Sequence, residues 1–430
     1  MNDELTATRR RGKRPTTSDY HVYRPIRLRT PLGTVHIYSK PGIFSWRRLD
    51  RAGTLVLRAL RDDGLPAGSR VLDLGCGHGG IGLSLLSLQP DLDLHLADSS
   101  YVAHTAVSLS IDRFSLPARA WLSDVTADIP AEQRFDVIVT HLPRGRVLAE
   151  QFLREAWERL EPGGRLYVTG TRDTGIRTRI DTLEQWFGKV DRLAAISGYR
   201  VARAIKTPGD PPPRTGDYGE WRTIEFQARG SSWQYMSKPG VFSWEHLDMG
   251  TQRLLENVEV RRGERVLDLG CGAGQVGVVV ASLVPGVHVT MVDDSLLAVR
   301  ASRLTAERNG LEATISLSDV GSAVIGERFD VVAANPPFHV GNTAEYDIAK
   351  QFIEDSRDML ETKGRLYLVA NAFIPYEEQM EAMFRRVDEA HRDNRYKVVL
   401  GARPVGRCKD RPKPPIVSEP KPRPPSVAPE

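Results

Sequence analysis

The chain has 430 residues, of which 40% are hydrophobic and 27% are charged, with a formal net charge of +4. This length suits two domains of roughly 180 to 200 residues each, in a soluble globular protein. We see no apolar run near the roughly 20 residues that span a bilayer, and no apolar core after the basic N-terminus, so neither a membrane partner nor a secretory signal is expected. Three cysteines are too few for a disulfide framework, which favours a reducing compartment, the cytoplasm.

Two charged segments flank the predicted domains. Residues 1–19 include the basic run RRRGKR, and residues 404–430 are rich in Pro, Lys and Arg. Both lack the apolar side chains that offset the entropy of ordering, so we expect them to be disordered. Each is either an electrostatic arm for a phosphate backbone or a solubilising tail, and both interpretations stay open.

Four segments occur twice in the chain, in the same order. They are SKPGIFSWRRLD (39–50) with SKPGVFSWEHLD (237–248), RVLDLGCGHGGIG (70–82) with RVLDLGCGAGQVG (265–277), LSDV (122–125 and 317–320), and GRLYV (164–168) with GRLYL (364–368). Such a repeat indicates two copies of one domain fused head to tail. We predict an N-terminal domain over residues 20–206, a Pro/Gly-rich linker over 207–218 and a C-terminal domain over 219–403.

Each copy alternates short apolar runs with helical patterns. RVLDLGC and FDVVAAN are typical of buried parallel strands, and VGVVVASLV is typical of the helix that follows such a strand. The alternation predicts an α/β fold with a doubly wound, mostly parallel, Rossmann-like sheet in each copy.

A glycine loop follows the first of these strands in the C-terminal copy. Gly270, Gly272 and Gly274 permit positive φ and close approach of a ligand, and Asp293 at the end of the next strand is placed to hold the hydroxyls of a ribose. The loop also satisfies the dinucleotide fingerprint, so a nicotinamide enzyme stays open on these residues alone.

Two carboxylates favour S-adenosylmethionine as the ligand of this loop. Asp268 precedes the first glycine, where it can meet the amino group of the donor. Asp319 follows another strand, where it can accept a hydrogen bond from an adenine amine. The N-terminal copy offers the corresponding residues, which are Asp73, Gly75, Gly77, Gly79 and Asp98.

The segment Asn335, Pro336, Pro337 and Phe338 directly follows a strand of the C-terminal copy. The prolines fix the backbone, so the Asn335 side-chain oxygen and a Pro336 carbonyl form a rigid pair of acceptors for an exocyclic amine. Phe338 offers a face on which a planar base can stack. Because a sulfonium already activates the methyl group, positioning carries most of the catalysis, and the scheme includes no metal.

The N-terminal copy departs from this pattern at the same place. It has His141, Leu142, Pro143 and Arg144, without an amide oxygen or a stacking ring. We therefore expect it to be non-catalytic. Basic residues in its loops are candidates for contacts with RNA phosphates or for a solvated face, and these are Arg144, Arg146, Arg172, Arg177 and Arg179.

The C-terminal copy closely resembles the ribosomal RNA small subunit methyltransferase C family. KPGVFSWEHLDMG, VLDLGCGAGQVG, NPPFHVG and VANAFIPYE match that family in order, over roughly residues 225–403. The resemblance implies a class I, S-adenosylmethionine-dependent enzyme that methylates the N2 of a guanine in 16S ribosomal RNA. Its implied partner is ribosomal RNA or the small ribosomal subunit.

The same resemblance implies roles for individual residues. Phe242 would lie in the donor pocket, and Phe338, His339 and Asn371 would lie near the substrate. The N-terminal copy would support folding and RNA binding.

Three other functions stay open on the sequence. They are methylation of a guanine in large-subunit ribosomal RNA, methylation of a glutamine amide in a protein, and a non-catalytic role in RNA binding or assembly. Phe338 and the duplicated first half disfavour the glutamine enzyme, which tends to have Tyr at that position.

Overall fold

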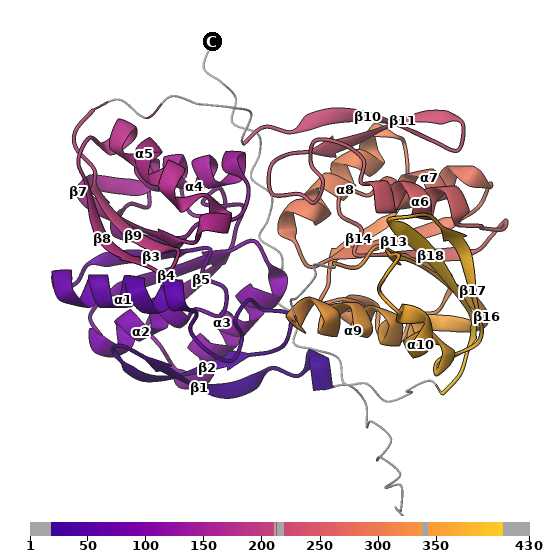
Figure 1. Ribbon diagram of the computed structural model, residues 1–430, viewed down its shortest axis with the longest axis horizontal. Coiled ribbons are helices and arrows are strands. Elements are labelled where there is room, and N and C mark those ends of the chain that lie inside the picture. The colour runs from indigo at the N-terminus through magenta and orange to yellow at the C-terminus, as the bar shows by residue number, and fades with distance from the viewer. Residues whose placement is uncertain (1–18, 210–211, 213–218, 338–342, 407–430) are drawn as a thin grey trace, which may run out of the picture.

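The structure is a computed structural model that describes residues 19–209, 212, 219–337 and 343–406 (Figure 1). Most of the predicted basic segment, linker and tail lies outside the described residues, and so do Phe338 and His339. The predicted domain boundaries therefore stay a prediction. Within these ranges no helix is both long and apolar enough to cross a bilayer.

The first half begins with a hairpin and continues as alternating strands and helices. Its elements are η1 (Asp19–His21), β1 (Arg24–Thr30), β2 (Gly33–Ser39), α1 (Arg51–Asp63), β3 (Arg70–Leu74), α2 (Gly80–Leu88), β4 (Asp93–Asp98), α3 (Tyr101–Phe114), β5 (Ala118–Leu122), β6 (Phe135–His141), α4 (Arg146–Arg159), β7 (Leu160–Gly170), η2 (Arg172–Thr174), α5 (Ile176–Phe187), β8 (Val190–Ile196) and β9 (Tyr199–Ile205).

The second half repeats this order. Its elements are β10 (Arg222–Ala228), β11 (Ser231–Ser237), α6 (Met249–Asn257), β12 (Arg265–Leu269), α7 (Gln275–Leu283), β13 (His288–Asp293), α8 (Leu296–Arg308), β14 (Thr314–Leu317), η3 (Ser322–Val324), β15 (Phe329–Ala334), α9 (Thr343–Met359), β16 (Leu360–Asn371), α10 (Tyr376–Glu381), β17 (Phe384–Arg392) and β18 (Tyr396–Pro404).

Each half contains a 7-stranded sheet, in the order β5-β4-β3-β6-β7-β9-β8 in the first and β14-β13-β12-β15-β16-β18-β17 in the second. The strands pair in parallel except β9 with β7 and β8, and β18 with β16 and β17. The predicted doubly wound, mostly parallel fold is confirmed. Strand order reverses between β3 and β6 and between β12 and β15, and doubly wound sheets bind ligands at the carboxyl ends of the strands beside such a reversal.

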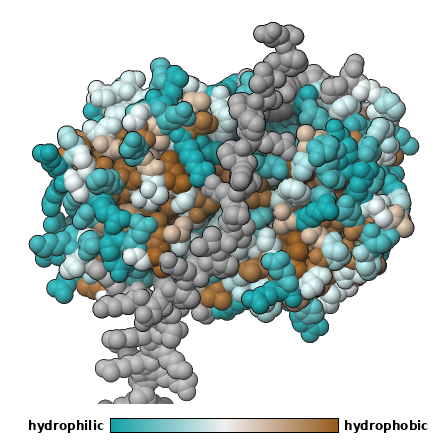
Figure 2. All heavy atoms as spheres, turned by 180° about the vertical axis from the view of Figure 1, so that it is seen from behind, coloured by the Kyte–Doolittle hydropathy of each residue, from teal (hydrophilic) through white to brown (hydrophobic). Residues whose placement is uncertain are grey.

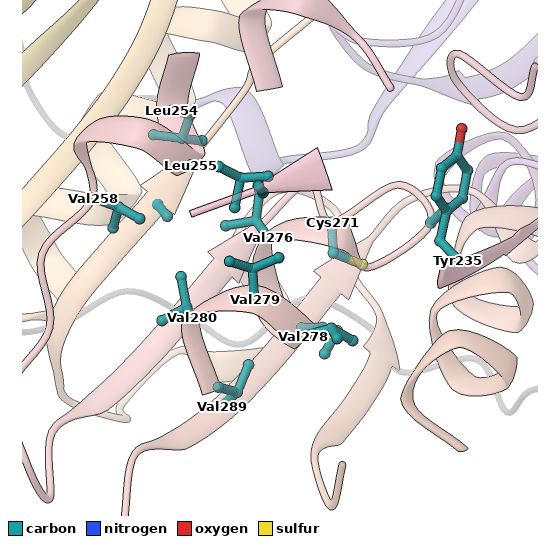
Figure 3. Packing of buried hydrophobic residues seen from close by; sticks show 14 of the residues in the cluster. Tyr235, Leu254, Leu255, Val258, Cys271, Val276, Val278, Val279, Val280 and Val289 are labelled. Atoms are coloured by element: carbon teal, nitrogen blue, oxygen red, sulfur yellow. The ribbon is translucent and has the colours of Figure 1, made fainter. Parts of the chain in front are cut away.

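One hydrophobic cluster of the second half packs the short apolar helix α7 against the sheet, and another packs α9 against it. Figure 3 shows Val276, Val279 and Val280 of α7 pointing toward neighbouring hydrophobic residues, with Val289 of β13 below them. These valines are at most 5% exposed. Burying such a side chain contributes about 1.5 to 3 kcal/mol, so this layer holds the start of α7, and with it the glycine loop, against the sheet.

The two halves lie side by side (Figure 1). The contact between them is reciprocal, because equivalent segments of each half bind the other half. Tyr101 N donates to Asp294 O, and Leu296 N donates to Ser99 O, each at 2.9 Å. The starts of α3 and α8 therefore abut, and the carboxyl ends of both sheets lie near the boundary between the halves.

The repeated SKPG segments cross this boundary in both directions. Lys40 Nζ lies 2.9 Å from Asp319 Oδ2 in the second half, and Lys238 pairs with Asp124 in the first. All four side chains are buried. Each half thus supplies the cation that compensates a buried acid of the other.

The face drawn in Figure 2 is mainly hydrophilic at its outer parts, and hydrophobic residues gather toward the middle. Large hydrophobic side chains that are well exposed include Phe44 (69%), Phe242 (61%) and Phe373 (66%). Phe44 and Phe242 occupy equivalent positions in the two copies, at the start of the FSW motif.

Candidate active site

The glycine loop of the second half connects β12 to α7 in a left-handed conformation. Gly270, Gly272 and Gly274 have φ values of 74°, 56° and 81°. A Cβ at Gly270 would lie 2.9 Å from the ring of Phe352, whereas a Cβ at Gly272 would meet no atom within 4 Å. The loop therefore packs tightly on one side and leaves open space on the other, as close approach of a ligand requires.

Asp293 holds this loop from the end of β13. Its Oδ2 accepts a hydrogen bond from Gly272 N and its Oδ1 accepts one from Ser295 N, both at 2.9 Å. Burial raises the pKa of Asp293. Phe242, Gly272 and Asp293 line one cavity of about 730 Å³, so the structure brings these three predicted residues together. The contact of Asp293 with a ribose stays a prediction.

Asp268 lies at the start of the loop and is 2% exposed. Its Oδ2 accepts a hydrogen bond from Gly277 N in the first turn of α7, at 2.9 Å. Burial raises the pKa of Asp268 to about 7. A ligand ammonium brought to this carboxylate would favour its charged form, which fits the predicted contact with the donor.

The amide of Asn335 is anchored on its nitrogen side. Nδ2 donates to Thr251 Oγ1 at 2.8 Å and to Asp248 Oδ2 at 3.1 Å. The hydrogen-bond partners fix which way the amide points, so the Oδ1 atom is left to accept from a substrate. Pro336 is buried and Pro337 is exposed, directly beyond β15.

The predicted site residues did not include Asp248 and Thr251. Asp248 is the N-cap of α6 and also accepts from Thr251 N at 2.8 Å, so one carboxylate fixes both the helix and the amide. The repeat carried a sign of this role, because Asp50 caps α1 in the first half in the same way. What the sequence did not show is that α6 begins beside the end of β15.

Asp319 follows β14, as predicted, but its carboxylate is bound by residues of the other half. It is 2% exposed, and its carboxylate is bound by Lys40 Nζ and by His21 Nδ1, which lies 2.9 Å from Oδ2. Burial alone would raise the pKa of Asp319, but Lys40 and His21 hold this pKa below its ordinary value. These contacts engage the carboxylate at the boundary between the halves and disfavour the contact with an adenine amine, which stays a prediction.

Asn371 is the last residue of β16 and is half-buried. Because β16 pairs in parallel with β15, Asn371 and Asn335 lie at the same edge of the sheet. The predicted position near the substrate site fits this placement.

The candidate arginines of the first half divide into three groups. Arg144 and Arg146 are exposed and line the 730 Å³ cavity together with Phe242. Arg172 and Arg177 are also exposed, farther along the chain. Arg179 is buried and pairs with Glu150, so its role is structural and an RNA contact is excluded for it.

The second half has a doubly wound sheet, a glycine loop bound by the carboxylate at the end of the next strand, and an anchored Asn-Pro-Pro segment. These features define an S-adenosylmethionine-dependent methyltransferase, and the fold occurs twice in this chain. The model of the methyltransferase small domain matches residues 34–203 and 232–400. Among curated relatives, the ribosomal RNA small subunit methyltransferase C of Aeromonas hydrophila is 34% identical over 268 residues, covering 62% of this chain and 77% of the relative. The one from Hahella chejuensis is 32% identical over 290 residues, covering 66% and 82%.

A solved structure shares the whole architecture. The Thermus thermophilus 16S rRNA N2 G1207 methyltransferase, in complex with AdoMet and guanosine, has a TM-score of 0.76 and 29% identity. The match covers 89% of this chain and 98% of that one. The chain belongs to the ribosomal RNA small subunit methyltransferase C family, and both of its halves are methyltransferase small domains.

Proposed function

We propose that the second half transfers a methyl group from S-adenosylmethionine to the exocyclic N2 amine of a guanine in small-subunit ribosomal RNA. The observation that carries this proposal is the anchored amide of Asn335, whose nitrogen is held 2.8 Å from Thr251 Oγ1. An amide held this way presents an oxygen acceptor at the carboxyl end of β15, next to the loop that holds the donor.

When bound, S-adenosylmethionine supplies a methyl group on a positively charged sulfur. Gly272 would leave space for the adenosine part and Asp293 would accept from the ribose hydroxyls, while Asp268, at the start of the loop, would face the donor ammonium. Asn335 Oδ1 and the Pro336 carbonyl each accept one N–H of the substrate amine, so that the nitrogen lone pair is aimed at the methyl. The C–N bond would form as the C–S bond of the donor breaks, which would leave S-adenosylhomocysteine, and the amine would then lose a proton to water.

RNA reaches this site across the boundary between the halves. Arg144 and Arg146 extend from the first half to the cavity that Phe242 lines, and phosphate contacts there would hold the strand beside the site. The target base must leave the duplex, because a guanine amine is hidden in the groove. The exposed rings of Phe242 and Phe373 lie on segments that flank the end of β15, and Phe338 itself lies outside the described residues.

The small subunit is favoured over the large one by the names of the relatives and of the solved structure, which state a small-subunit enzyme. A protein substrate has less support, because the architecture matches a structure that holds guanosine. An enzyme for ribosomal RNA works where ribosomes are assembled, so we place it in the cytoplasm.

The test is transfer of labelled methyl from S-adenosylmethionine to unmodified small- and large-subunit ribosomal RNA and subunits, followed by nucleoside mass spectrometry. We expect N2-methylguanosine in the small-subunit samples. Label in the large-subunit samples alone would keep the chemistry and contradict the substrate. No label in any RNA sample would contradict the proposed function.

A further inference from the structure

The first half has a cavity of its own that the proposed mechanism does not use. It has a volume of about 310 Å³, at the lower end of the range for small-molecule sites. Its lining includes Phe44, Gly75, Gly77, Asp98 and Ser123, which lie on the first-half counterparts of the elements that build the proposed donor site in the second half.

The contacts that shape the loop are the same in both halves. Asp98 Oδ2 accepts from Gly77 N at 2.8 Å, and Asp98 Oδ1 accepts from Ser100 N at 2.9 Å. The second half has 2.9 Å for both of its corresponding contacts. The carboxylate of Asp98 is thus held on the first-half loop in the same way as the carboxylate of Asp293 on the second-half loop.

The space for a ligand has also been kept. Gly77 has φ 55°, and a Cβ there would meet no atom within 4 Å, as at Gly272. Phe44 is 69% exposed at the position equivalent to Phe242. Neither a glycine facing open space nor an exposed aromatic ring is required by packing.

A buried acid at the start of the loop is likewise retained. Asp73 is 1% exposed, and its Oδ2 accepts from Gly82 N at 2.8 Å. A buried carboxylate without a cation is costly, and a neutral side chain of similar size would avoid that cost. A ligand with an ammonium group would compensate the charge, as proposed for Asp268.

The acceptor end of this cavity is built differently. His141 Nε2 lies 3.5 Å from Asp50 Oδ2, and the His141 ring lies 6.0 Å from the ring of Phe44. An imidazole there offers neither the amide oxygen nor the Asn-Pro-Pro backbone that would orient an amine. We infer that the first half is a second binding site for an S-adenosyl compound, which it holds without transferring the methyl group.

The second half contributes to this site. Gly240 and Leu297, from across the boundary, line the same cavity as Leu148 of α4. An S-adenosyl ligand in the first half therefore touches both halves. Its binding should stabilise their association, because a ligand that binds only the assembled fold raises its stability by mass action.

The experiment counts bound ligand by isothermal titration of the full chain with S-adenosylhomocysteine, without RNA. We expect two equivalents for the wild type, one for Asp98→Ala and one for Asp293→Ala. Phe44→Ala is the second variant, since its exposed ring is not needed for folding, and we expect at least tenfold weaker binding at one of two sites. Phe242→Ala is its counterpart in the other half, and thermal unfolding of each variant without ligand reports whether it folds.

Two equivalents that neither Asp98→Ala nor Phe44→Ala alters would overturn the inference, and so would a single equivalent that both variants leave intact. A single equivalent that Asp98→Ala removes and Asp293→Ala spares would support it while contradicting the donor site of the proposed function. Because the readout is bound ligand, failure of RNA methylation alone leaves the inference standing.

Discussion

The two halves share one fold and differ at the segment that would face a substrate. In the second half Asp248 and Thr251 hold the amide nitrogen of Asn335. In the first half His141 takes that place, 3.5 Å from Asp50 Oδ2. The helix cap that anchors the segment is thus common to both halves, and the side chain it anchors is not. The comparison teaches that fold and anchor can persist while the reacting group is exchanged.

The halves also differ in how they compensate a buried acid at their boundary. Asp319 is met by Lys40 and by His21, whose ring also lies 3.0 Å from Asp355. Figure 1 shows the start of the described chain, with η1, close to α9 of the second half. The N-terminal segment of one half is therefore bound to the helix that follows the Asn-Pro-Pro segment of the other.

The first half has a simpler version of this arrangement. Lys238 pairs with Asp124, and the nearby acid is Glu155, whose pKa burial raises to about 7. Where DYHVYR (19–24) repeats as DYGEWR (217–222), the counterpart of His21 is Gly219. Among the described residues, the additional histidine therefore lies only beside the buried acid of the second half.

The largest expected effect comes from removing Lys238, because within the described part of the chain no histidine lies beside its partner Asp124 as His21 lies beside Asp319. Lys238→Met should lower the free energy of unfolding by about 3 to 5 kcal/mol, since it leaves a buried carboxylate without its cation. Lys40→Met should cost less, because His21 stays beside Asp319. Urea unfolding of both variants checks this, with Lys189→Met, an 85% exposed side chain, as a control expected within about 0.5 kcal/mol of the wild type. An equal or larger loss for Lys40→Met would break the comparison.

The next effect concerns the amide that distinguishes the halves. Asn335→Ala should lower the rate of methyl transfer about 10²- to 10³-fold, the size seen when one group aligned with a transition state is removed. Binding of S-adenosylhomocysteine should stay within about twofold, because the variant removes an acceptor and leaves the glycine loop intact.

The control is Asn257→Ala, which makes the same truncation at the far end of the helix that anchors Asn335. Single-turnover transfer and ligand titration report the two quantities separately. Transfer by Asn335→Ala at close to the wild-type rate would show that the amide isn't part of the mechanism.

The third prediction is a loss of stability at alkaline pH. Burial alone would lower the pKa of His21 from its ordinary value of 6.5, but the carboxylates of Asp355 and Asp319 raise it to about 9. A raised histidine pKa stabilises the fold fully below about pH 6.5, and the stabilisation is lost as the pH rises through about 9. The contribution is at most about 3 kcal/mol. In thermal unfolding from pH 6 to 9.5, His21→Gln should show a smaller decline than the wild type, and parallel declines would contradict the ion pairs.

The smallest effect is expected at Arg144, an exposed side chain that lines the cavity beside Phe242. Arg144→Ala should weaken RNA binding by a few-fold at moderate salt and reduce the slope of log K against log salt by about 0.7 to 0.9, the share of one phosphate contact. Arg61→Ala is the matched control, since Arg61 is exposed and pairs with its neighbour Asp62. Unequal slopes for wild type and Arg144→Ala are the result sought, and equal slopes would remove Arg144 from the RNA path.

Much of this protein was determined by local features of the sequence. The repeated segments, the short apolar runs before glycines and the Asn-Pro-Pro after a strand each act over a few residues, so their meaning does not depend on distant partners. These features were enough to predict the two sheets and the enzyme class, an S-adenosylmethionine-dependent methyltransferase.

Only the tertiary structure decided which groups bind Asp319 and Asn335. Asp319 had the right type and place for an adenine contact, yet its partners Lys40 and His21 lie 279 and 298 residues away in the other half. The anchor of Asn335 is 84 to 87 residues away. A carboxylate or an amide has the same local sequence context whether it faces a ligand or another domain, because the free energy of a buried polar group depends on which atoms surround it after the chain has folded.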